Sequence, residues 1–471
     1  MPQIPINLGV RSNPGREKEA GQARLVNCYA ERADEEGRVQ WPLYASDGYQ
    51  AFATLSGGGA TRAMLTLNAD ALYVVSGAKV FKITSTGVVT DLGSVSASGY
   101  ATMARNRRLP NNEIGIVTSD GNYYVIDNDV LTQVDVSGFP VTFVSITSLD
   151  GYFVLAASNG EWYITSIDNA TLIDTLDFEK AQAHPDGLLI NKTRGSDLVL
   201  FGENSIEFWQ DTGAADFPFE RTEAVEFGCY SAGSVAEIVV ISPGGAIADS
   251  IIFAAQDQAG FYVGVMMLSG YSAGKISTLA LDRAIRDEPD QASIQSFTWS
   301  KDGHAFYCIT GSSFTWVYDT ATSLWHERES SGLTRWKALH AASLGNKVIV
   351  GDYATGELYQ MLHTATDEAG ATLTWKVIPP DVHAYPNTLR FYDIRANVIL
   401  GLVAGNLTVR HSNDHGTNWI TRTASVASGK RAKILRLGQS KEDGKVFEIS
   451  ADASVVKGIM SLNTNAIQLR G

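Results

Sequence analysis

Short runs of alternating apolar and polar residues, separated by tight polar turns, recur along the middle of this chain. Alternation with a period of two places apolar side chains on one face of an extended strand. Gly or Asn beside another small polar residue tolerates the positive φ that short hairpin turns require. The pattern predicts seven β-hairpins in series, at residues 71–83, 114–127, 152–166, 198–212, 251–265, 305–320 and 348–361.

The spacing of these hairpins indicates how they are assembled. Successive hairpins start 38 to 54 residues apart, close to the ~40–50 residues of a four-stranded propeller blade. Each hairpin would then be the two most regular strands of one blade. The sequence therefore predicts an all-β chain in which residues 61–361 form a β-propeller of six or seven blades.

The two flanks of the predicted propeller have different patterns. Residues 1–60 contain no repeat, and glycines interrupt their charged stretch, so we expect an N-terminal arm laid on another surface. Residues 362–471 alternate over seven strand-like runs, which predicts a C-terminal β-sandwich. A propeller brings its first and last blades together. We therefore expect the arm and the sandwich to emerge near one another and to form one platform.

One hairpin end carries a more specific pattern, VYDTATSLWHER. It resembles the kelch-type blade turn, in which Tyr318, Asp319, Thr322 and Trp325 would close the hairpin. Asp319 can accept hydrogen bonds from backbone N–H groups of the turn, while Trp325 packs between blades. The alternative is an ordinary amphipathic hairpin that happens to contain a tryptophan.

The stretch SNDHGTNW in the predicted sandwich resembles the Asp box of sialidases and other propeller glycosidases. Its pattern residues are Ser412, Asp414, Gly416 and Trp419. Ser412 and Asp414 would bind backbone N–H groups inside a hairpin turn, Gly416 would supply an unusual dihedral angle, and Trp419 would anchor the turn to the core. These roles are structural. A mark of a glycosidase is the alternative interpretation.

No catalytic set can be selected from the sequence. A glycosidase needs two carboxylates facing each other across a sugar, and nothing singles out such a pair. Arg105, Arg107 and Arg108 could in principle bind a substrate carboxylate, but a basic loop is more often a solvated turn or a partner contact. His411 and His415 lie in and beside the Asp-box turn, away from any helical zinc motif. We predict no catalytic, cofactor or metal site, and a protein that is not an enzyme.

The amino-acid composition further limits the class of protein to which this chain can belong. Of 471 residues, 44% are hydrophobic and the formal net charge is −14. This balance argues for a folded protein without wide phosphate contacts, although an acidic surface could line a channel through which DNA slides. Cys28, Cys229 and Cys308 are too few and too far apart for a disulfide framework, so we expect buried apolar side chains. No apolar run is long enough to span a membrane, and no export signal is expected.

A longer stretch, HPDGLLINKTRGSDLVLFGENSIEFWQDTGA from His184 to Ala215, resembles the packaged-DNA stabilisation, or tail hub and nozzle, proteins of short-tailed double-stranded DNA phages. The order Pro-Asp-Gly, apolar strand, spacer, DLVLFG, SIEFW and Thr-Gly carries the resemblance. LVNCYAERA, residues 25–33, followed by PLYASDGYQAF, is similar to the N-terminal arm of that family. Asp47-Gly48 stands where the family has a Pro-Gly turn.

The resemblance implies a structural role. It suggests a homohexamer ring below the portal and its adaptor protein, with tail fibres or tailspikes attached outside and a plug or needle closing the channel. Such a hub would retain packaged DNA and later conduct it during genome ejection. It would belong to the virion tail, be assembled in the host cytoplasm and need no cofactor. A propeller glycan-binding protein or glycosidase is one alternative, and a generic propeller interaction scaffold is another.

Overall fold

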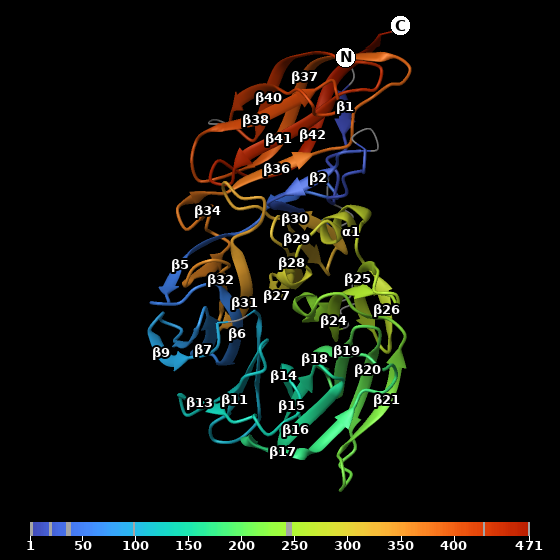
Figure 1. The fold of residues 1–471 in the computed structure, drawn as a ribbon. Coiled ribbons are helices and arrows are strands. Elements are labelled where there is room, and N and C mark those ends of the chain that lie inside the picture. The colour runs from blue at the N-terminus through green and yellow to red at the C-terminus, as the bar shows by residue number, and fades with distance from the viewer. Residues whose placement is uncertain are drawn as a thin grey trace.

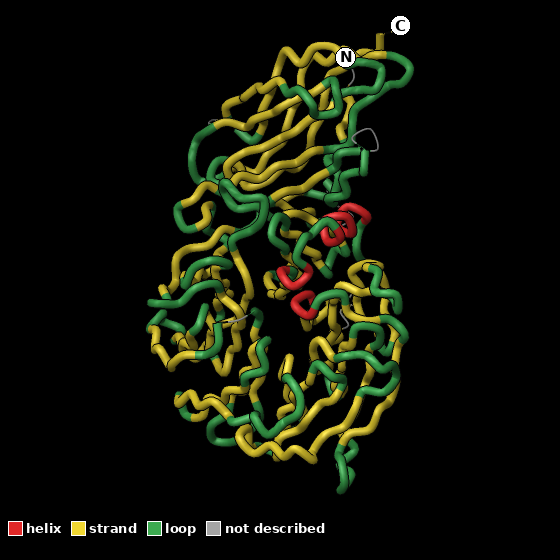
Figure 2. Tube along the Cα trace, in the orientation of Figure 1, coloured by secondary structure: helices red, strands yellow, loops and turns green. Residues whose placement is uncertain are grey.

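The computed structural model describes residues 3–17, 21–33, 39–97, 99–241, 247–426 and 429–469, and these are almost entirely strands and turns. In this described part the one α-helix is α1 (Leu279–Arg286), and two short 3₁₀ turns, η2 (Ala232–Ser234) and η3 (Gln291–Ser293), lie close to it in sequence. Figure 2 shows these helical residues gathered in one region of the molecule. No described helix is long and apolar enough to cross a membrane.

A ring of antiparallel sheets fills the lower part of Figure 1. The first three blades are β6 (Thr61–Asn68) to β9 (Val89–Ser94), β10 (Ala101–Arg105) to β13 (Val130–Val134), and β14 (Phe143–Leu149) to β17 (Asn169–Lys180). Their middle strands are β7 (Ala71–Ser76), β8 (Lys79–Ile83), β11 (Ile114–Thr118), β12 (Tyr123–Asp127), β15 (Tyr152–Ala157) and β16 (Glu161–Ser166).

The next three blades continue the ring. The fourth has β18 (Leu188–Arg194), β19 (Asp197–Gly202), β20 (Ile206–Asp211) and β21 (Phe219–Val225). The fifth has β22 (Gly228–Cys229), β23 (Ala236–Ile241), β24 (Ile247–Gln256), β25 (Tyr262–Ser269) and β26 (Ser272–Lys275). The sixth has β27 (Gln295–Lys301), β28 (His304–Thr310), β29 (Thr315–Asp319) and β30 (Leu324–Glu327).

A strand from the N-terminal segment completes the ring. The seventh blade contains β31 (Ala338–Leu344), β32 (Lys347–Asp352) and β33 (Glu357–Leu362), and its fourth strand is β5 (Gly48–Thr54), antiparallel to β33. The short strands β34 (Asp367–Glu368) and β35 (Ala371–Thr372) extend this sheet. The described residues thus form seven blades, within the predicted range. β5 belongs to the last blade although the sequence placed it in the arm.

Each predicted hairpin is the middle pair of strands of one blade, as the alternation predicted. These strands are buried on both faces because neighbouring blades cover them. Leu72 and Val75 of β7, for example, are each 0% exposed. The turn after β7 needs glycine, since Gly77 has φ 55° and a Cβ there would lie 2.9 Å from the backbone nitrogen of Gly59.

A β-sandwich lies above the propeller in Figure 1, and the N-terminal segment contributes strands to both of its sheets. One sheet contains β2 (Arg24–Val26), β36 (Thr374–Ile378), β41 (Val446–Asp452), β38 (Asn406–Ser412) and β39 (Ile420–Ser425). The other contains β3 (Cys28–Ala30), β4 (Leu43–Ala45), β42 (Val456–Leu469), β37 (Thr388–Leu400) and β40 (Arg431–Gln439), with β1 (Gln3–Ile6) paired to β42.

The apolar core of the sandwich lies between these two sheets. Phe391 of one sheet meets Phe447 of the other edge to face, with ring centroids 5.4 Å apart. The indole nitrogen of Trp375 donates a hydrogen bond to the carbonyl of Val456, 2.6 Å away on the opposite sheet. Leu25 of the N-terminal segment is 1% exposed in the same core, so the first strands of the chain are structural parts of the C-terminal domain.

Candidate functional site

The Asp-box stretch forms the turn between β38 and β39. The Ser412 hydroxyl accepts hydrogen bonds from the backbone N–H groups of Asp414 and Gly416, at 3.2 and 2.9 Å, and donates to the Asp414 carboxylate at 2.6 Å. Asp414 also accepts from the backbone and side-chain N–H groups of Asn418, at 2.8 and 2.6 Å. These contacts hold the pKa of Asp414 well below its usual range, the Asn418 backbone first among them. The Asp414 carboxylate therefore stabilises the turn between β38 and β39.

The tryptophan of this stretch takes a different place from the one expected. Trp419 is half-buried, and the guanidinium carbon of Arg410 lies 4.7 Å from the centre of its ring. Arg410 in turn pairs with Glu448 at 2.8 Å. A cation over an indole face is attractive. Trp419 therefore packs under a salt-bridged arginine on the sheet surface and not in the core.

The two histidines beside this turn have separate surroundings. His411 is 3% exposed, and burial lowers its pKa to about 4, assisted by the nearby charge of Lys445. His415 lies 3.7 Å from a carboxylate oxygen of Asp381. In the part of the chain that the structure describes, no group of three or more His, Cys, Asp or Glu side chains is placed to hold a metal ion.

The kelch-like stretch closes the hairpin between β29 and β30. Asp319 is 1% exposed and accepts hydrogen bonds from the backbone N–H of Ala321 at 3.0 Å and the hydroxyl of Thr322 at 2.8 Å. His304 contacts the same carboxylate through Nδ1 at 2.9 Å, and this hydrogen bond raises the pKa of His304. Asp319 thus fixes both the turn and the neighbouring strand β28.

Trp325 joins the fifth and sixth blades. Its indole is 1% exposed, and its nitrogen donates a hydrogen bond to the carbonyl of Ile276, which directly follows β26, at 2.7 Å. Tyr318 lies against it with ring centroids 5.1 Å apart. The aromatic positions of this pattern therefore fill the space between two blades.

The basic loop that follows β10 makes contacts within the propeller. Arg105 donates to the carbonyl of Leu67 in the first blade at 2.5 Å. Arg107 donates to the carbonyl of Asp150 in the third blade at 2.7 Å and lies 3.4 Å from its carboxylate. These two arginines of the second blade thus reach in opposite directions, one to each neighbouring blade.

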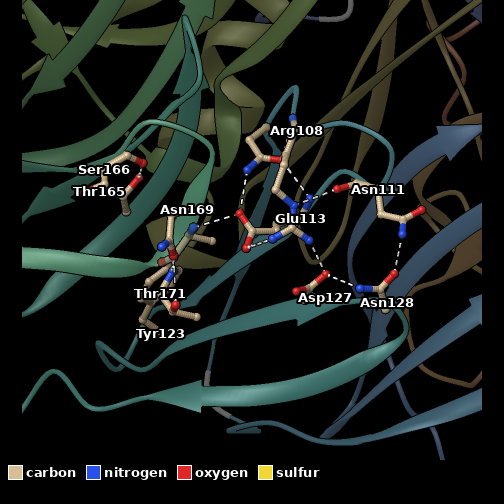
Figure 3. A network of polar contacts seen from close by, with 12 residues as sticks. Arg108, Asn111, Glu113, Tyr123, Asp127, Asn128, Thr165, Ser166, Asn169 and Thr171 are labelled. Carbon is tan, nitrogen blue, oxygen red and sulfur yellow. Dashed lines mark hydrogen bonds and ion pairs between the residues drawn. The ribbon is translucent and has the colours of Figure 1, made fainter.

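The third arginine of the loop forms part of a partly buried polar network, drawn in Figure 3. Arg108 pairs with Glu113 at 2.7 Å and also contacts the carboxylate of Asp127. Glu113 is 3% exposed and accepts from the side chain of Asn106 at 2.7 Å and from the backbone N–H of Ala170 at 2.9 Å. The network joins the second and third blades, so these arginines do not converge on a shared substrate site.

The motif Pro-Asp-Gly before β18 also has a structural task. The carboxylate of Asp186 accepts from the backbone N–H groups of Asn204 and Ser205, at 2.5 and 3.1 Å, in the turn between β19 and β20. Gly187 passes so close to the neighbouring blade that a Cβ would lie 2.4 Å from the carbonyl oxygen of Ser158. The motif fixes the entry into the fourth blade.

The inner strands of the propeller leave two adjoining cavities. One, of about 230 Å³, is lined by residues that include Thr102, Lys192 and His340. The other, of about 600 Å³, opens beside Tyr100 and Tyr230. Burial lowers the pKa of His340 to about 4, and Lys192 adds to the shift. The two linings also contain the carboxylates of Glu237, Glu203 and Asp290. Among the described residues, no hydrogen bond or ion pair joins any of them to His340.

The joint between propeller and sandwich is a polar site that the sequence analysis did not identify. Arg24 of β2 donates to both carboxylate oxygens of Glu327 in β30, with its Nε 3.0 Å from one of them. Glu329, just beyond β30, pairs with Lys376 of β36 at 3.0 Å. Arg24 and Glu327 are 303 positions apart in the chain, and Glu329 and Lys376 are 47 apart, so no local pattern marks them as neighbours.

The three cysteines are free and buried. Burial raises the pKa of the Cys229 thiol to about 12, and burial likewise raises the pKa of Cys28 and Cys308. Thiols with raised pKa values are poor nucleophiles and metal ligands. They fill space in the cores, as small apolar residues would.

The sequence of this chain is similar to a family of phage proteins and to one curated member. A family model described as "Bacteriophage P22 Gp10, beta-propeller" matches residues 2–366. "Tail hub protein gp10" of Salmonella phage P22 is 24% identical over 271 residues, which cover 54% of this chain and 53% of that protein. The chain therefore spans about half the length of that curated relative in the match.

Solved propellers are more distant. A catalytically inactive virginiamycin B lyase from Staphylococcus aureus has a TM-score of 0.45 and 10% identity, over 66% of this chain and 98% of the lyase. The WD40 β-propeller domain of Doa1 has a TM-score of 0.39 and 12% identity, over 67% of this chain and 97% of that one. At these scores the propeller assignment rests on strand pairing and on the family.

Proposed function

The chain belongs to the family described as Bacteriophage P22 Gp10, beta-propeller, a family of phage tail hub proteins, and from this membership we propose that it retains packaged DNA and forms the channel for genome ejection. The observation that carries the proposal is the family match over residues 2–366, which spans the N-terminal strands and all seven blades. The hub is a structural component of the virion tail and not an enzyme.

The proposed assembly is a ring of six copies. Head-to-tail contacts between identical subunits either close into a cycle or continue as a filament, and a hub requires closure. In this assembly the platform, made of residues 1–60 without β5 and of residues 362–471, contacts neighbouring copies and the portal adaptor. The propeller, residues 61–361 with β5 closing it, projects outward and carries tail fibres or tailspikes. A plug or needle closes the channel.

Two features of the chain support this division of labour. The N-terminal and C-terminal strands are paired in one sandwich, so a single rigid body is available for assembly contacts. The propeller closes on itself through β5 and β33, so it needs no partner to complete its sheets. Its acidic surface would repel the DNA backbone and allow the genome to pass rapidly.

The alternative function, a propeller glycan-binding protein or glycosidase, has lost its main support. Asp414 and Ser412 are hydrogen-bonded to their own turn, and the loop arginines bind neighbouring blades. A fluorogenic sialoside or glucoside assay on the purified protein checks this point. Turnover that Asp414→Asn abolishes without loss of folding would restore the alternative.

Retention of DNA by assembled particles tests the proposed function. Phage particles made without functional subunit should package DNA and then lose it, so that nuclease-protected DNA per capsid falls after packaging. Particles complemented with the wild-type subunit serve as the control. Full retention of the genome without the subunit would contradict the proposal.

A further inference from the structure

Charge is distributed unevenly along this acidic chain. Residues 374–471 contain 13 Lys or Arg and 7 Asp or Glu, out of totals of 37 and 51, so residues 1–373 contain 24 and 44. The C-terminal segment therefore has a formal charge of +6 and the rest of the chain −20. Such an asymmetry is typical of proteins that contact a polyanion with one part.

The two outer faces of the sandwich differ in how their cations are paired. On the sheet that contains β36 and β38, Lys376 pairs with Glu329 at 3.0 Å and Arg410 with Glu448 at 2.8 Å. These charges are neutralised within the protein. Arg422 of β39 is the one cation on the strands of this sheet without a carboxylate partner among the described residues, whereas the sheet that contains β37, β40 and β42 has several.

Strand register places the unpaired cations of that sheet on one face. Along β40, Arg431, Lys433 and Leu435 are exposed while Ala432 and Ile434 are buried. The strands pair directly, so each exposed residue has a cross-strand neighbour about 4.5–5.5 Å away between Cβ atoms. We call this surface the basic face. It consists of four rows of cross-strand neighbours, each written in the order β40, β37, β42: Arg431–Asn397–Ser461, Lys433–Arg395–Asn463, Leu435–Asp393–Asn465 and Gln439–Arg390–Ile467.

Two like charges stand opposite each other in the second row. Arg395 and Lys433 are a direct cross-strand pair, an arrangement that is destabilising unless an anion lies nearby. Asp393 supplies one such anion: it is 4% exposed, lies 3.1 Å from Arg395 and 3.5 Å from Lys433, and accepts from Asn465 at 2.8 Å. One carboxylate between two cations leaves the row positive.

The two other cations of the basic face have no carboxylate partner among the described residues. Arg431 is exposed and forms no ion pair there, and Arg390 lies over the ring of Tyr392 at 5.6 Å. Asp393 is the one acidic residue in the four rows. The face therefore presents four cationic side chains against one carboxylate that is already occupied.

The chemistry of the basic face favours phosphate over a protein partner. Three of its four cations are arginines, which bind phosphate oxygens with two parallel hydrogen bonds, and asparagine and serine add further donors. Protein interfaces instead concentrate aromatic and other apolar anchors at their centre and exclude charge from it. The two central rows here contain Lys433, Arg395, Asn463, Asp393 and Asn465, with Leu435 as their one apolar residue.

We propose that the basic face of the sandwich binds the phosphate backbone of double-stranded DNA without regard to sequence. The proposal rests on the proposed function, since it gives the hub a surface that binds the DNA it retains. It also refines the expectation drawn from net charge: the acidic propeller repels DNA, while one sheet of the sandwich holds it. Lysine and arginine on edge strands also prevent aggregation, but that role does not require cations on the inner strand β37.

Binding of the full-length protein to a fluorescently labelled 30-base-pair duplex tests the proposal. Fluorescence anisotropy at 50 mM salt should give binding with Kd in the range of about 10⁻⁶ to 10⁻⁴ M, and log K should fall with log salt with a slope of about −3 to −4 for four cations. Arg390→Gln/Arg431→Gln removes two cations that do not contact Asp393. It should weaken binding roughly tenfold or more and reduce the slope by about 2.

Lys376→Gln/Arg422→Gln is the matched control, because it removes two positive charges from the opposite sheet of the same domain. Arg390→Gln/Arg431→Gln should unfold at the wild-type temperature. The control, which loses the Lys376–Glu329 ion pair, should unfold no more than a few degrees lower and should bind DNA as the wild type does. Equal weakening by the two variants, or no binding at 50 mM salt, would overturn the proposal. Equal affinity for a poly-glutamate peptide would assign the face to an acidic protein instead. Each of these results is independent of whether particles lacking the subunit lose their DNA.

Discussion

Val26 of β2 pairs in parallel with Glu327 of β30, so that one continuous sheet runs from the sixth propeller blade into the sandwich. β2 also pairs antiparallel with β36, and Arg24 on the same strand binds Glu327. Backbone hydrogen bonds and a bidentate ion pair thus join the two domains. A joint of this kind resists hinge motion, and it explains how the N-terminal strands can be shared between an assembly platform and a propeller.

The propeller should depend on its closing strand. A fragment of residues 48–362 contains all four strands of the seventh blade, whereas residues 61–362 lack β5 and leave the edge of β33 unpaired. We expect the longer fragment to be a folded, β-rich monomer by size-exclusion chromatography and circular dichroism. The shorter one should melt at a lower temperature or aggregate, because an exposed edge strand promotes association. Equal melting temperatures would show that β5 does not close the ring.

Trp325 should stabilise the contact between the fifth and sixth blades. Trp325→Phe removes the hydrogen bond to the Ile276 carbonyl and part of a fully buried indole. We expect the free energy of unfolding in urea to fall by about 1–3 kcal/mol. Trp419→Phe, at a half-buried indole, is the matched control and should change it by less than about 1 kcal/mol. A smaller effect at Trp325 than at Trp419 would argue against this role.

The Asp-box turn should affect stability and not catalysis. Ser412→Ala leaves the backbone N–H groups of Asp414 and Gly416 without their acceptor. We expect a loss of about 1–2 kcal/mol in the free energy of unfolding of the sandwich, monitored by its tryptophan fluorescence. Thr423→Ala on the exposed strand β39 serves as the control. An unchanged unfolding curve for Ser412→Ala would mean that the turn forms without the serine.

Stability should fall as the pH drops below about 6.5, the unfolded pKa of histidine. Burial lowers the folded pKa of His326 to about 3 and those of His340 and His411 to about 4. Between the folded pKa of each histidine and about pH 6.5, the unfolded chain binds a proton that the folded protein does not bind. Each histidine therefore lowers the free energy of unfolding by at most about 1.4 kcal/mol per pH unit as the pH falls. His304, whose pKa Asp319 raises, acts in the opposite direction.

A single substitution separates this effect from general acid denaturation. His326 lies among aromatic rings, 5.9 Å from Tyr29 and 6.3 Å from Phe306 between ring centroids, so phenylalanine fits its surroundings. The free energy of unfolding of His326→Phe, measured from pH 6.5 to 5, should decline less steeply than that of the wild type. Parallel curves for the two proteins would show that His326 takes up its proton in the folded state.

The middle strands of each blade could be predicted from the sequence because their two strands adjoin and alternate within 13 to 16 residues. The strand β5 could not be predicted as part of a blade. Its sequence, GYQAFAT, is too short to be distinguished from other short apolar runs, and its partner β33 lies about 300 residues further along the chain. The same separation concealed the joint between β2 and β30. Pairing over such distances is determined by the fold and not by local pattern.

The candidate residues show the same division. The contacts of Asp319 and Ser412 inside their own turns lie within four residues, where spacing alone determines geometry. The surroundings of Trp419 and Arg108 depend on neighbouring strands and blades. Trp419 was expected in the core and instead lies under Arg410 on the sheet surface. The net charge of the whole chain combines the negative charge of the propeller with the positive charge of the C-terminal segment. The basic face could therefore be identified only once the strand register was known.

Electron cryo-microscopy of tails isolated from virions would show whether this subunit is the hub. We expect a closed ring of the subunit around the channel, with the sandwich toward the head and the seven-bladed propellers on the periphery. Neighbouring subunits should contact one another through their sandwich strands. A tail without the subunit in a ring, or with its propellers stacked along the channel and its sandwiches free at the periphery, would rule out the proposed hub.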